Sequence, residues 1–486
     1  MFRFLITVLI LSTVIISSSS LVNAQHNPGE LTVELQTVLK SGSNVPFWLW
    51  ANKRGKVNGA SDNLIYDINY IAPKTEVGAF TFTGGIDLTS NIAAKNSVNF
   101  SQAYVGAKFK GFKLTAGRYY REQGFQDSPL GLGTMVIGRH ASAIPGIEFS
   151  TDNFISIPFT HNYMKYKLSL GHYWFEKDRH IEGAYLHSKD FYLQIDLVRL
   201  KLSAGIIHNV MWGGRTPAGQ DLGSSFDDFL RVFSGRGAAE GYFSQGEVLT
   251  ALGNTVAAYD TGILWDSETI RIHATRLFFL EDKSALLFRS AWDGQWTLDV
   301  EPRKTKVLKH FRYDYFFTIR QDAFANQPGG RANYYGHGIY RSGWTYQNKV
   351  LGVPLITLDY ADNKINKTVN NMIVAQSIST KIEIMDGFTA TGSFLYSRNY
   401  GVCQDLKSPT GQGCAGSIEK DIPLPGIVQR HTVRKDHYLM ATEFDYDLPQ
   451  IEGMRIKVAF GVDIKEEQKT NYGLTFGLKY APNLLR

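Results

Sequence analysis

Segments of alternating apolar and polar residues dominate this sequence, and a period of two residues is typical of β-strands that bury one face. Residues 80–92 alternate around Phe80 and Phe82, and residues 471–480 repeat the pattern near the end of the chain. In residues 97–111 the alternation predicts that four residues share one face: Val98, Phe100, Gln102 and Tyr104. The segment 112–124 follows directly after Gly111, which signals a tight hairpin turn.

The number and length of these segments favour a barrel that crosses a membrane. Roughly 16 to 19 candidate strands follow from the period, and many are about ten residues long. A tilted strand of about 9 to 11 residues crosses the hydrocarbon core of a bilayer. Short turns alternate with long polar connections, as in outer-membrane barrels. We therefore predict an all-β fold, a transmembrane antiparallel β-barrel of about 18 strands, with a soluble protein of several sheets as the alternative.

One region, residues 224–254, departs from the alternation. Its apolar residues recur at helical spacing: Phe226, Phe229, Leu230 and Phe233. Ser225 suits the N-cap, and two aspartates follow it in the first turn. We expect a short helix inside a long connection, acting as a small helical plug or insertion.

The first 24 residues are typical of a secretory signal peptide. Arg3 precedes an apolar run of about a dozen residues, and Val22-Asn23-Ala24 forms a small-residue cleavage pattern. The run is too short for a membrane-spanning helix, and no later apolar run approaches about 18 residues. We expect residues 1–24 to be removed and residues 25–486 to form the barrel.

Composition and charge restrict the function further. Aromatic residues make up 13% of the chain, which includes 25 Tyr and 46 Gly, and this richness suits strands and interfacial belts. Without Arg3 the chain has 50 basic residues (51 − 1) and 45 acidic ones, a net charge of +5. This mild charge without clustering does not indicate nucleic-acid binding, so we expect no nucleic-acid partner.

Motifs for catalysis or metal binding are missing from the sequence. It contains no GxSxG, P-loop, HExxH or EF-hand pattern, so we expect no enzyme, no cofactor and no metal site. A pair of glycosidase carboxylates cannot be recognised from sequence alone. Cys403 and Cys414 flank a Gly- and Pro-containing loop, and in an exported protein they predict one disulfide, with free thiols as the alternative.

Four segments combine aromatic rings with Arg, Asn, Gln or Asp: 44–59, 208–217, 252–265 and 338–355. Rings can stack on the apolar faces of a sugar while planar polar groups bind its hydroxyls. The predicted polysaccharide-binding residues are Trp212, Arg215, Arg341, Trp344 and Tyr346. The alternative places the rings in interfacial belts and the polar groups in the lumen. In the first segment we favour an interfacial girdle or barrel-end packing for Phe47, Trp48 and Trp50.

These segments also resemble a known family. "PFWLWANKRGKV", "HNVMWGG", "LGNTVAAYD" and "YRSGWTYQNKVLGVPL" are similar, in this order, to blocks of the capsule-assembly family Wzi in its Bacteroidetes-type form. The resemblance spans most of the mature chain. It implies an outer-membrane barrel with a helical periplasmic plug and lectin-like binding of surface polysaccharide. Two features depart from the family pattern: Trp50 stands where relatives often carry a basic residue, and the chain lacks a terminal aromatic residue.

The sequence favours two functions, and a third, a surface polysaccharide-modifying enzyme, would need two convergent carboxylates in a cleft. The first is an outer-membrane lectin-like protein that binds capsular or exopolysaccharide and anchors it at the cell surface, where many weak contacts along one polymer give avidity. The second is an outer-membrane porin or saccharide channel, which an open lumen would favour. The expected surroundings are outer-membrane lipid and surface polysaccharide, and we expect a monomer.

Overall fold

The computed structural model describes most of the chain beyond the predicted signal peptide. The described residues are 29–121, 123–242, 244, 247–248, 251–281, 286, 288, 290–321, 332–360, 364–402 and 434–482. The signal peptide and the Cys403–Cys414 disulfide lie outside these residues, so both stay predictions.

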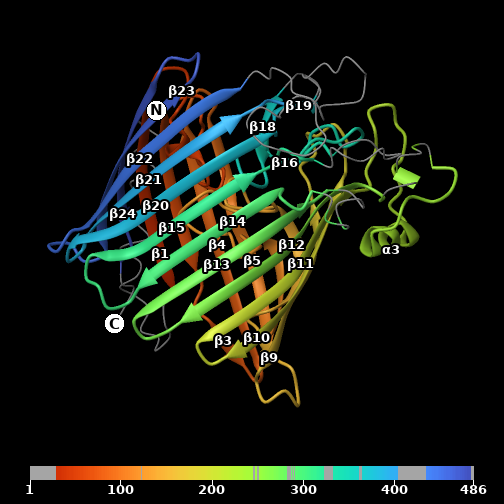
Figure 1. Ribbon diagram of the computed structural model, residues 1–486, viewed down its shortest axis with the longest axis horizontal. Coiled ribbons are helices and arrows are strands. Elements are labelled where there is room, and N and C mark those ends of the chain that lie inside the picture. The colour runs from red at the N-terminus through yellow and green to blue at the C-terminus, as the bar shows by residue number, and fades with distance from the viewer. Residues whose placement is uncertain are drawn as a thin grey trace.

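The fold is a closed antiparallel barrel of 18 strands. Each strand pairs with the next along the ring, and β1 closes the ring by pairing with both β2 and β24 (Figure 1). The ring strands are β1 (Glu30–Ser41), β2 (Asn63–Ile71), β4 (Phe80–Ile92), β5 (Ser97–Phe109), β6 (Phe112–Arg118), β7 (Pro145–Thr151), β9 (Met164–Trp174), β10 (Tyr185–Leu197), β11 (Leu200–Trp212), β12 (Asn254–Asp266), β13 (Ile270–Leu280), β14 (Gly294–Pro302), β15 (Leu308–Phe317), β20 (Ile373–Met385), β21 (Phe388–Asn399), β22 (Lys435–Asp447), β23 (Met454–Lys465) and β24 (Asn471–Tyr480).

The remaining elements are short. Two strands extend the edge of the ring, and two small hairpins and two helices lie in the connections. They are β3 (Thr75–Val77), β8 (Ile155–Ser156), β16 (Thr345–Tyr346), β17 (Lys349–Val350), β18 (Thr357–Tyr360), β19 (Asn366–Asn370), α2 (Phe47–Trp50) and α3 (Phe226–Ser234). Among the described residues, neither helix has the length and apolar character that a membrane span requires.

The predicted strands 80–92 and 471–480 coincide with β4 and β24. The predicted single face of β5 is wrong. In the pairing of β4 with β5, Asp87 opposes Gln102 but the next residue, Leu88, opposes Phe100. Ser101 is therefore an extra residue that forms a bulge in β5. Val98 and Phe100 therefore face outward, whereas Gln102 and Tyr104 face the lumen.

The two ends of the barrel differ in their connections. At one end short turns join the strands, for example 110–111, 198–199 and 386–387. Long connections leave the other end, and they include the sequence ranges 42–62, 119–144, 213–253 and 318–372. Bacterial outer-membrane barrels have short periplasmic turns and long extracellular loops, so this rule assigns the long-connection end to the cell exterior.

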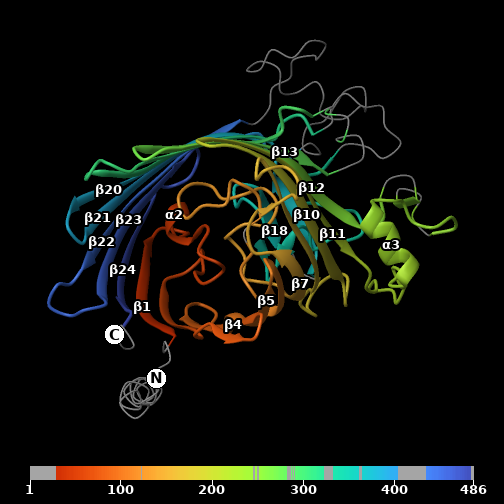
Figure 2. The ribbon, with the colours of Figure 1, turned by 90° about the horizontal axis from the view of Figure 1, so that it is seen from below.

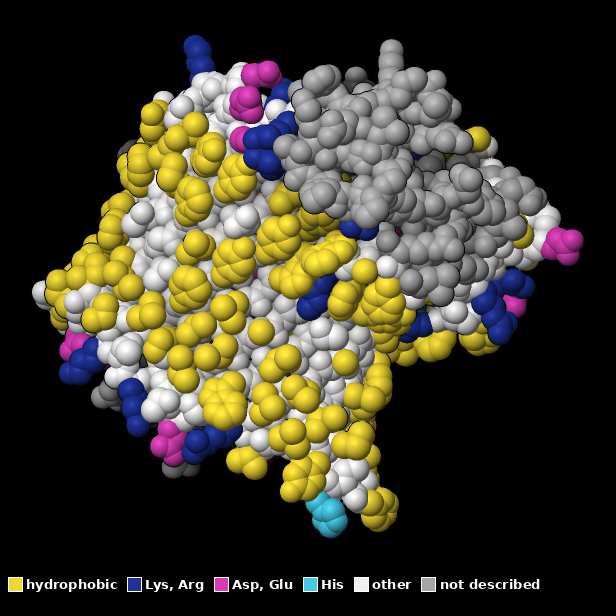
Figure 3. Space-filling model, viewed as in Figure 1, with side chains coloured by type: hydrophobic (Ala, Val, Ile, Leu, Met, Phe, Trp, Pro, Cys, Tyr) yellow, Lys and Arg dark blue, Asp and Glu magenta, His cyan; other side chains and the backbone are white. Residues whose placement is uncertain are grey.

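The outer wall of the barrel is apolar and the lumen is polar. Exposed apolar residues such as Phe82, Val105 and Ile206 point outward, whereas Asp260 and Arg312 are buried inside. Figure 3 shows hydrophobic side chains spread over the strands and charged side chains near the two ends of the barrel. Apolar side chains thus face the lipid, and polar side chains face the lumen, where they form hydrogen bonds.

Aromatic residues form a girdle at the long-connection end of the wall. They occupy outward positions at or near the ends of their strands: Trp174, Tyr185, Trp212, Trp296 and Tyr315. Trp and Tyr favour the boundary between lipid and water because one part of the ring system is apolar and the other polar. The girdle therefore marks the height of one membrane–water interface.

Candidate functional site

Three long connections turn back into the barrel and fill its long-connection end. We call them together the inner plug: residues 42–62, 119–144 without residue 122, and 332–360. Figure 2 shows these segments inside the ring of strands. Their apolar residues pack with lumen-facing residues of the wall into one core, which includes Phe47, Leu132 and Trp344.

The first plug segment carries the short helix α2. The backbone N–H of Phe47 donates to the Asp463 carboxylate at 3.0 Å, and the Trp48 Nε1 donates to the Leu439 carbonyl at 3.1 Å. The fit is close, since a Cβ at Gly473 would lie 2.6 Å from the Cδ of Pro46. The aromatic residues of this segment therefore pack inside the end of the barrel, which agrees with the predicted barrel-end packing and not with the alternative of an interfacial girdle.

The second plug segment, 119–144, is held to the wall by buried polar groups. Asp260 accepts hydrogen bonds from the backbone N–H of Phe125 at 2.8 Å and from the Gln126 side chain at 2.9 Å. On another part of the ring, Asp314 accepts from the backbone N–H of Leu132 at 3.2 Å. A buried carboxylate with several donors fixes the segment strongly, because loss of a donor would leave a buried charge uncompensated.

The third plug segment, 332–360, packs onto the second. The Trp344 Nε1 donates to the carbonyl of Val136 at 2.7 Å, and the Tyr335 hydroxyl donates to the carbonyl of Met135 at 2.6 Å. Arg179, from the connection between β9 and β10, donates to the carbonyl of Thr345 at 2.7 Å. The plug is thus one packed unit rather than three independent loops.

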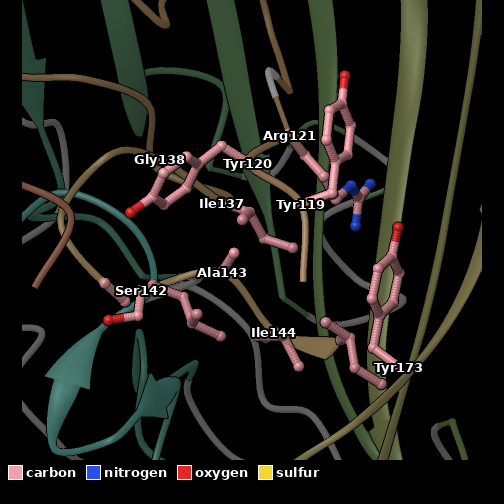
Figure 4. A pocket seen from close by; sticks show the side chains of 12 residues that line it. Tyr119, Tyr120, Arg121, Ile137, Gly138, Ser142, Ala143, Ile144 and Tyr173 are labelled. Atoms are coloured by element: carbon pink, nitrogen blue, oxygen red, sulfur yellow. The ribbon is translucent and has the colours of Figure 1, made fainter. Parts of the chain in front are cut away.

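A small cavity remains between the second plug segment and the wall. Figure 4 shows its lining, which includes Tyr119, Tyr120 and Ile144 from the plug and Tyr173 from β9. Its volume is about 30 Å³. That space suits one water molecule and is far below the volume of a sugar ring, so this cavity is not a saccharide site.

A larger hollow opens at the long-connection end, and we call it the mouth groove. It has a volume of about 560 Å³. Four chain segments and Ser142 of the second plug segment line it; the four are 55–58, 89–101 around the β4–β5 turn, 176–178 and 347–349. Side chains with amide, ammonium or hydroxyl groups dominate the lining, among them Asn58, Asn91, Lys95, Asn99, Gln347 and Lys349.

Hydrogen bonds hold several groove residues in place. Asn99 accepts a hydrogen bond from the Arg118 guanidinium at 2.9 Å and donates to the Gln347 side chain at 3.3 Å. The backbone N–H of Gln347 donates to Glu176 at 3.1 Å. The two sides of the groove are therefore linked, which positions the planar amides before any ligand arrives.

Two lysines of the groove differ in their electrostatic surroundings. Lys56 forms ion pairs with Asp67 at 2.8 Å and Asp87 at 2.9 Å, and these carboxylates outweigh the effect of burial and raise the pKa of Lys56. Lys349 donates to the Val57 carbonyl at 3.0 Å, and burial lowers the pKa of its ammonium to about 8. Among the described residues, no carboxylate forms an ion pair with Lys349 like those that stabilise the charge of Lys56.

The structure separates the five predicted polysaccharide-binding residues. Trp344 and Tyr346 belong to the core of the inner plug, with 0% and 1% of their surfaces exposed, and Trp212 faces the outer wall with 3% exposed. Buried rings cannot stack on a sugar, so their placement does not support the predicted contacts. Arg215 and Arg341 lie at the long-connection end, where Arg215 pairs by backbone hydrogen bonds with Glu182 and the side chain of Arg341 is exposed.

Part of the groove lies outside the segments predicted to contact sugar. Residues 95–99, at the β4–β5 turn and the start of β5, contain no aromatic ring, whereas 55–58 and 347–349 lie within the segments 44–59 and 338–355 although none of these residues was predicted to bind saccharide. The dense Asn, Gln, Lys and Ser content of these turns is the sequence signal that could have identified them. No cluster of three or more potential metal ligands occurs within the part of the chain that the structure describes.

The predicted helix forms as α3 but does not plug the barrel. The Ser225 hydroxyl accepts from the backbone N–H of Asp228 at 3.2 Å, which confirms the predicted N-cap. Figure 2 shows α3 outside the ring of strands, and it belongs to a connection of the long-connection end. In the described residues, the helical periplasmic plug that the family resemblance implies is therefore not found.

Comparisons with known proteins bear on the fold. No protein family matches the sequence, and no characterised protein matches it at the sequence level. Among solved structures, Wzi of Escherichia coli, described as a carbohydrate-binding β-barrel involved in group 1 capsule assembly, is similar with a TM-score of 0.53 and 13% identity, over 93% of this chain and 84% of Wzi. OpdL of Pseudomonas aeruginosa has a TM-score of 0.48 and 10% identity, over 94% of this chain and 98% of OpdL. OprD of the same species has a TM-score of 0.45 and 10% identity, over 95% and 97%.

At these identities the likeness shows the fold and not the family. The closed ring of 18 strands, its apolar outer wall and the likeness of its fold to the outer-membrane barrel Wzi agree with one another. The chain is an outer-membrane β-barrel protein.

Proposed function

We propose that this protein is a non-enzymatic, lectin-like protein that binds surface polysaccharide in the mouth groove and anchors it to the outer membrane. The observation that carries the proposal is the inner plug. Its segments are hydrogen-bonded to the wall, for example through Asp260, Asp314 and Asp463, and they leave a polar groove at the long-connection end. Such a plug favours a surface for binding over a wide passage for solutes.

The chemistry of the groove suits a carbohydrate. Planar amides such as Asn99 and Gln347 can donate and accept, which matches the hydroxyl groups of sugars. The volume of about 560 Å³ lies within the usual range of ligand sites, about 300 to 1,000 Å³. One groove would hold only a short part of a polymer, so retention of the polymer would come from many proteins acting on one chain.

The fold-level likeness to a carbohydrate-binding barrel supports the same proposal, together with the four sequence segments that resemble the Wzi family. The alternative is a porin or saccharide channel. A second hollow of about 390 Å³, lined by Lys108, Lys113 and Tyr104, lies at the short-turn end and gives that alternative its own support.

A binding measurement tests the proposal directly. Capsular or exopolysaccharide from the producing strain is titrated onto the purified barrel, and onto the variant Lys95→Ala/Asn99→Ala. The variant removes two polar side chains of the groove, so we expect its affinity to fall about tenfold, as loss of one or two hydrogen bonds implies. The matched control is Lys304→Ala/Lys306→Ala on the turn after β14, at the opposite end of the barrel.

Two results would overturn the proposal. Unchanged affinity of the groove variant, alongside an unchanged control, would exclude the groove as the binding site. Stable large conductance of the intact protein in planar bilayers would favour the channel. In cells, deletion of the gene should release the polymer into the medium at normal synthesis, and undiminished retention would contradict anchoring.

A further inference from the structure

The connection after β11 folds back against the outer wall of the barrel. Outward positions of β10 are recognised from the exposed residues Phe191 and Leu193, and His187 and Lys189 share that face. On β11 the outward face includes His208, Val210 and Trp212, at its long-connection end. α3 lies against these positions, outside the ring of strands (Figures 1 and 2).

Specific contacts hold α3 on the wall. The Phe229 ring packs 6.0 Å from Trp212 and 5.4 Å from His187, measured between ring centroids. Val232 is 1% exposed and belongs to a small core with Val210 and Trp212. The Lys189 ammonium donates to the Phe233 carbonyl at the C-terminal end of the helix. α3 is therefore packed against the wall and does not project freely.

One face of α3 is only partly covered by the described residues, because Phe233 at its edge contacts His187 and Lys189 of the wall while the rest of the face projects away from it. Phe226, Leu230 and Phe233 are 74%, 46% and 40% exposed, and they follow one another at helical spacing beside the packed Phe229. Asp227 and Arg231 form an ion pair at 2.8 Å on the other side of the helix. The helix is thus amphipathic, with its apolar face only partly covered by the barrel.

The position of α3 along the membrane normal identifies the surroundings of its exposed apolar face. Its contacts on the wall, Tyr185 and Trp212, belong to the aromatic girdle that marks a membrane–water interface. The lipid-facing surface of the same strands continues from there through Ile206 and Phe191, which are 40% and 43% exposed. The apolar face of α3 is therefore continuous with a surface that already contacts lipid.

From this arrangement we propose that α3 is an interfacial helix whose face of Phe226, Leu230 and Phe233 inserts among the acyl chains of the outer leaflet. The helix also covers His187, a polar residue that would otherwise face lipid at the edge of the membrane. An amphipathic helix that lies in the interface plane buries its apolar face at the boundary of head groups and acyl chains. This inference depends on the outer-membrane location and not on the proposed saccharide binding.

Photo-crosslinking of the full-length barrel in proteoliposomes of phosphatidylcholine and phosphatidylglycerol tests the proposal. p-Benzoylphenylalanine replaces Phe226 or Leu230 on the apolar face, and Asp227 or Arg231 on the polar face serves as the matched control. Irradiated protein is analysed by mass spectrometry for lipid adducts. We expect several-fold more lipid adduct at positions 226 and 230 than at 227 and 231.

Folding of each variant is checked by the change in its electrophoretic mobility on heating. Positions 226 and 230 are tested in separate variants, so failure of one variant to fold leaves the other as a test. Equal lipid labelling on both faces would overturn the proposal. Crosslinks from position 226 or 230 to a second copy of the chain or to another protein would also overturn it, because the face would then be a protein interface. Lipid adducts confined to the apolar face would support it, whatever the result of the saccharide titration.

Discussion

Lys349 shows how burial changes one residue of the mouth groove. Its pKa falls from 10.5 to about 8 because burial disfavours the charged ammonium. Between these two values the unfolded chain binds more protons than the folded one, so folding becomes more favourable as the pH rises from about 8 to 10.5.

We therefore expect Lys349→Met to be more stable than the natural protein near pH 7, and this advantage to shrink toward pH 10. The two proteins differ in their free energy of unfolding, and this difference should change by about 2 kcal/mol between pH 7 and pH 10. Each unit of pKa shift is worth about 1.4 kcal/mol. Equilibrium urea unfolding in detergent micelles at several pH values measures it. A difference between the two proteins that does not vary with pH would contradict the assignment.

At the scale of elements, local sequence predicted α3 well. Ser225 and Asp228 form a reciprocal capping box, with the Asp228 carboxylate accepting from the backbone N–H of Ser225 at 3.1 Å. Gly235 ends the helix with a φ of 66°, a left-handed conformation that glycine adopts without strain. These signals lie within a few residues of the helix, so they could be recognised without knowledge of the fold.

Ser225→Ala should destabilise α3 without affecting the barrel. Loss of an N-cap costs about 1 kcal/mol, which corresponds to roughly fivefold faster opening of the helix. Amide hydrogen exchange measures this on the α3 peptides, while exchange in the ring strands should stay unchanged. Ser224→Ala is the matched control next to the cap, and an equal effect of both substitutions would show that the cap is not the cause.

The strand β5 illustrates the opposite case. Alternation correctly predicted its extent, but the bulge at Ser101 reverses which side chains face the lumen beyond it. A bulge depends on pairing with the neighbouring strand, so the residues of β5 alone do not contain that information.

For the whole molecule, the two ends of the barrel are unequal, and this asymmetry makes its orientation testable. We expect an epitope inserted after Gly241, in the long connection that carries α3, to bind antibody on intact cells. An epitope inserted after Lys304, in the turn between β14 and β15, should bind only after the outer membrane is permeabilised. Gly241 suits insertion because a Cβ there would have no atom within 4 Å.

The second insertion is the control for the first, since both lie in exposed connections of the same barrel. Antibody labelling of the Lys304 insertion on intact cells would show that the short-turn end, and not the long-connection end, faces the cell exterior. The mouth groove would then face the periplasm, and polysaccharide binding at the cell surface would lose its structural basis.

By itself, the sequence determined the barrel, its strand positions and the helix α3. The strands are recognised from a period of two residues, because each strand has lipid on one side and the polar lumen on the other. The helix is recognised from its apolar spacing and its N-cap, which also lie within a few residues. The resemblance to a capsule-assembly family also came from short local blocks, and the structure supports the barrel that it implied.

Only the tertiary structure decided where the connections go. Trp344 finds its partner, the Val136 carbonyl, 208 residues away, and no local pattern encodes such a contact. An aromatic residue near polar ones looks the same in sequence whether it lines a binding site or fills an inner plug. The mouth groove likewise exists only because turns distant in sequence, such as 95–99 and 347–349, meet at one end of the barrel.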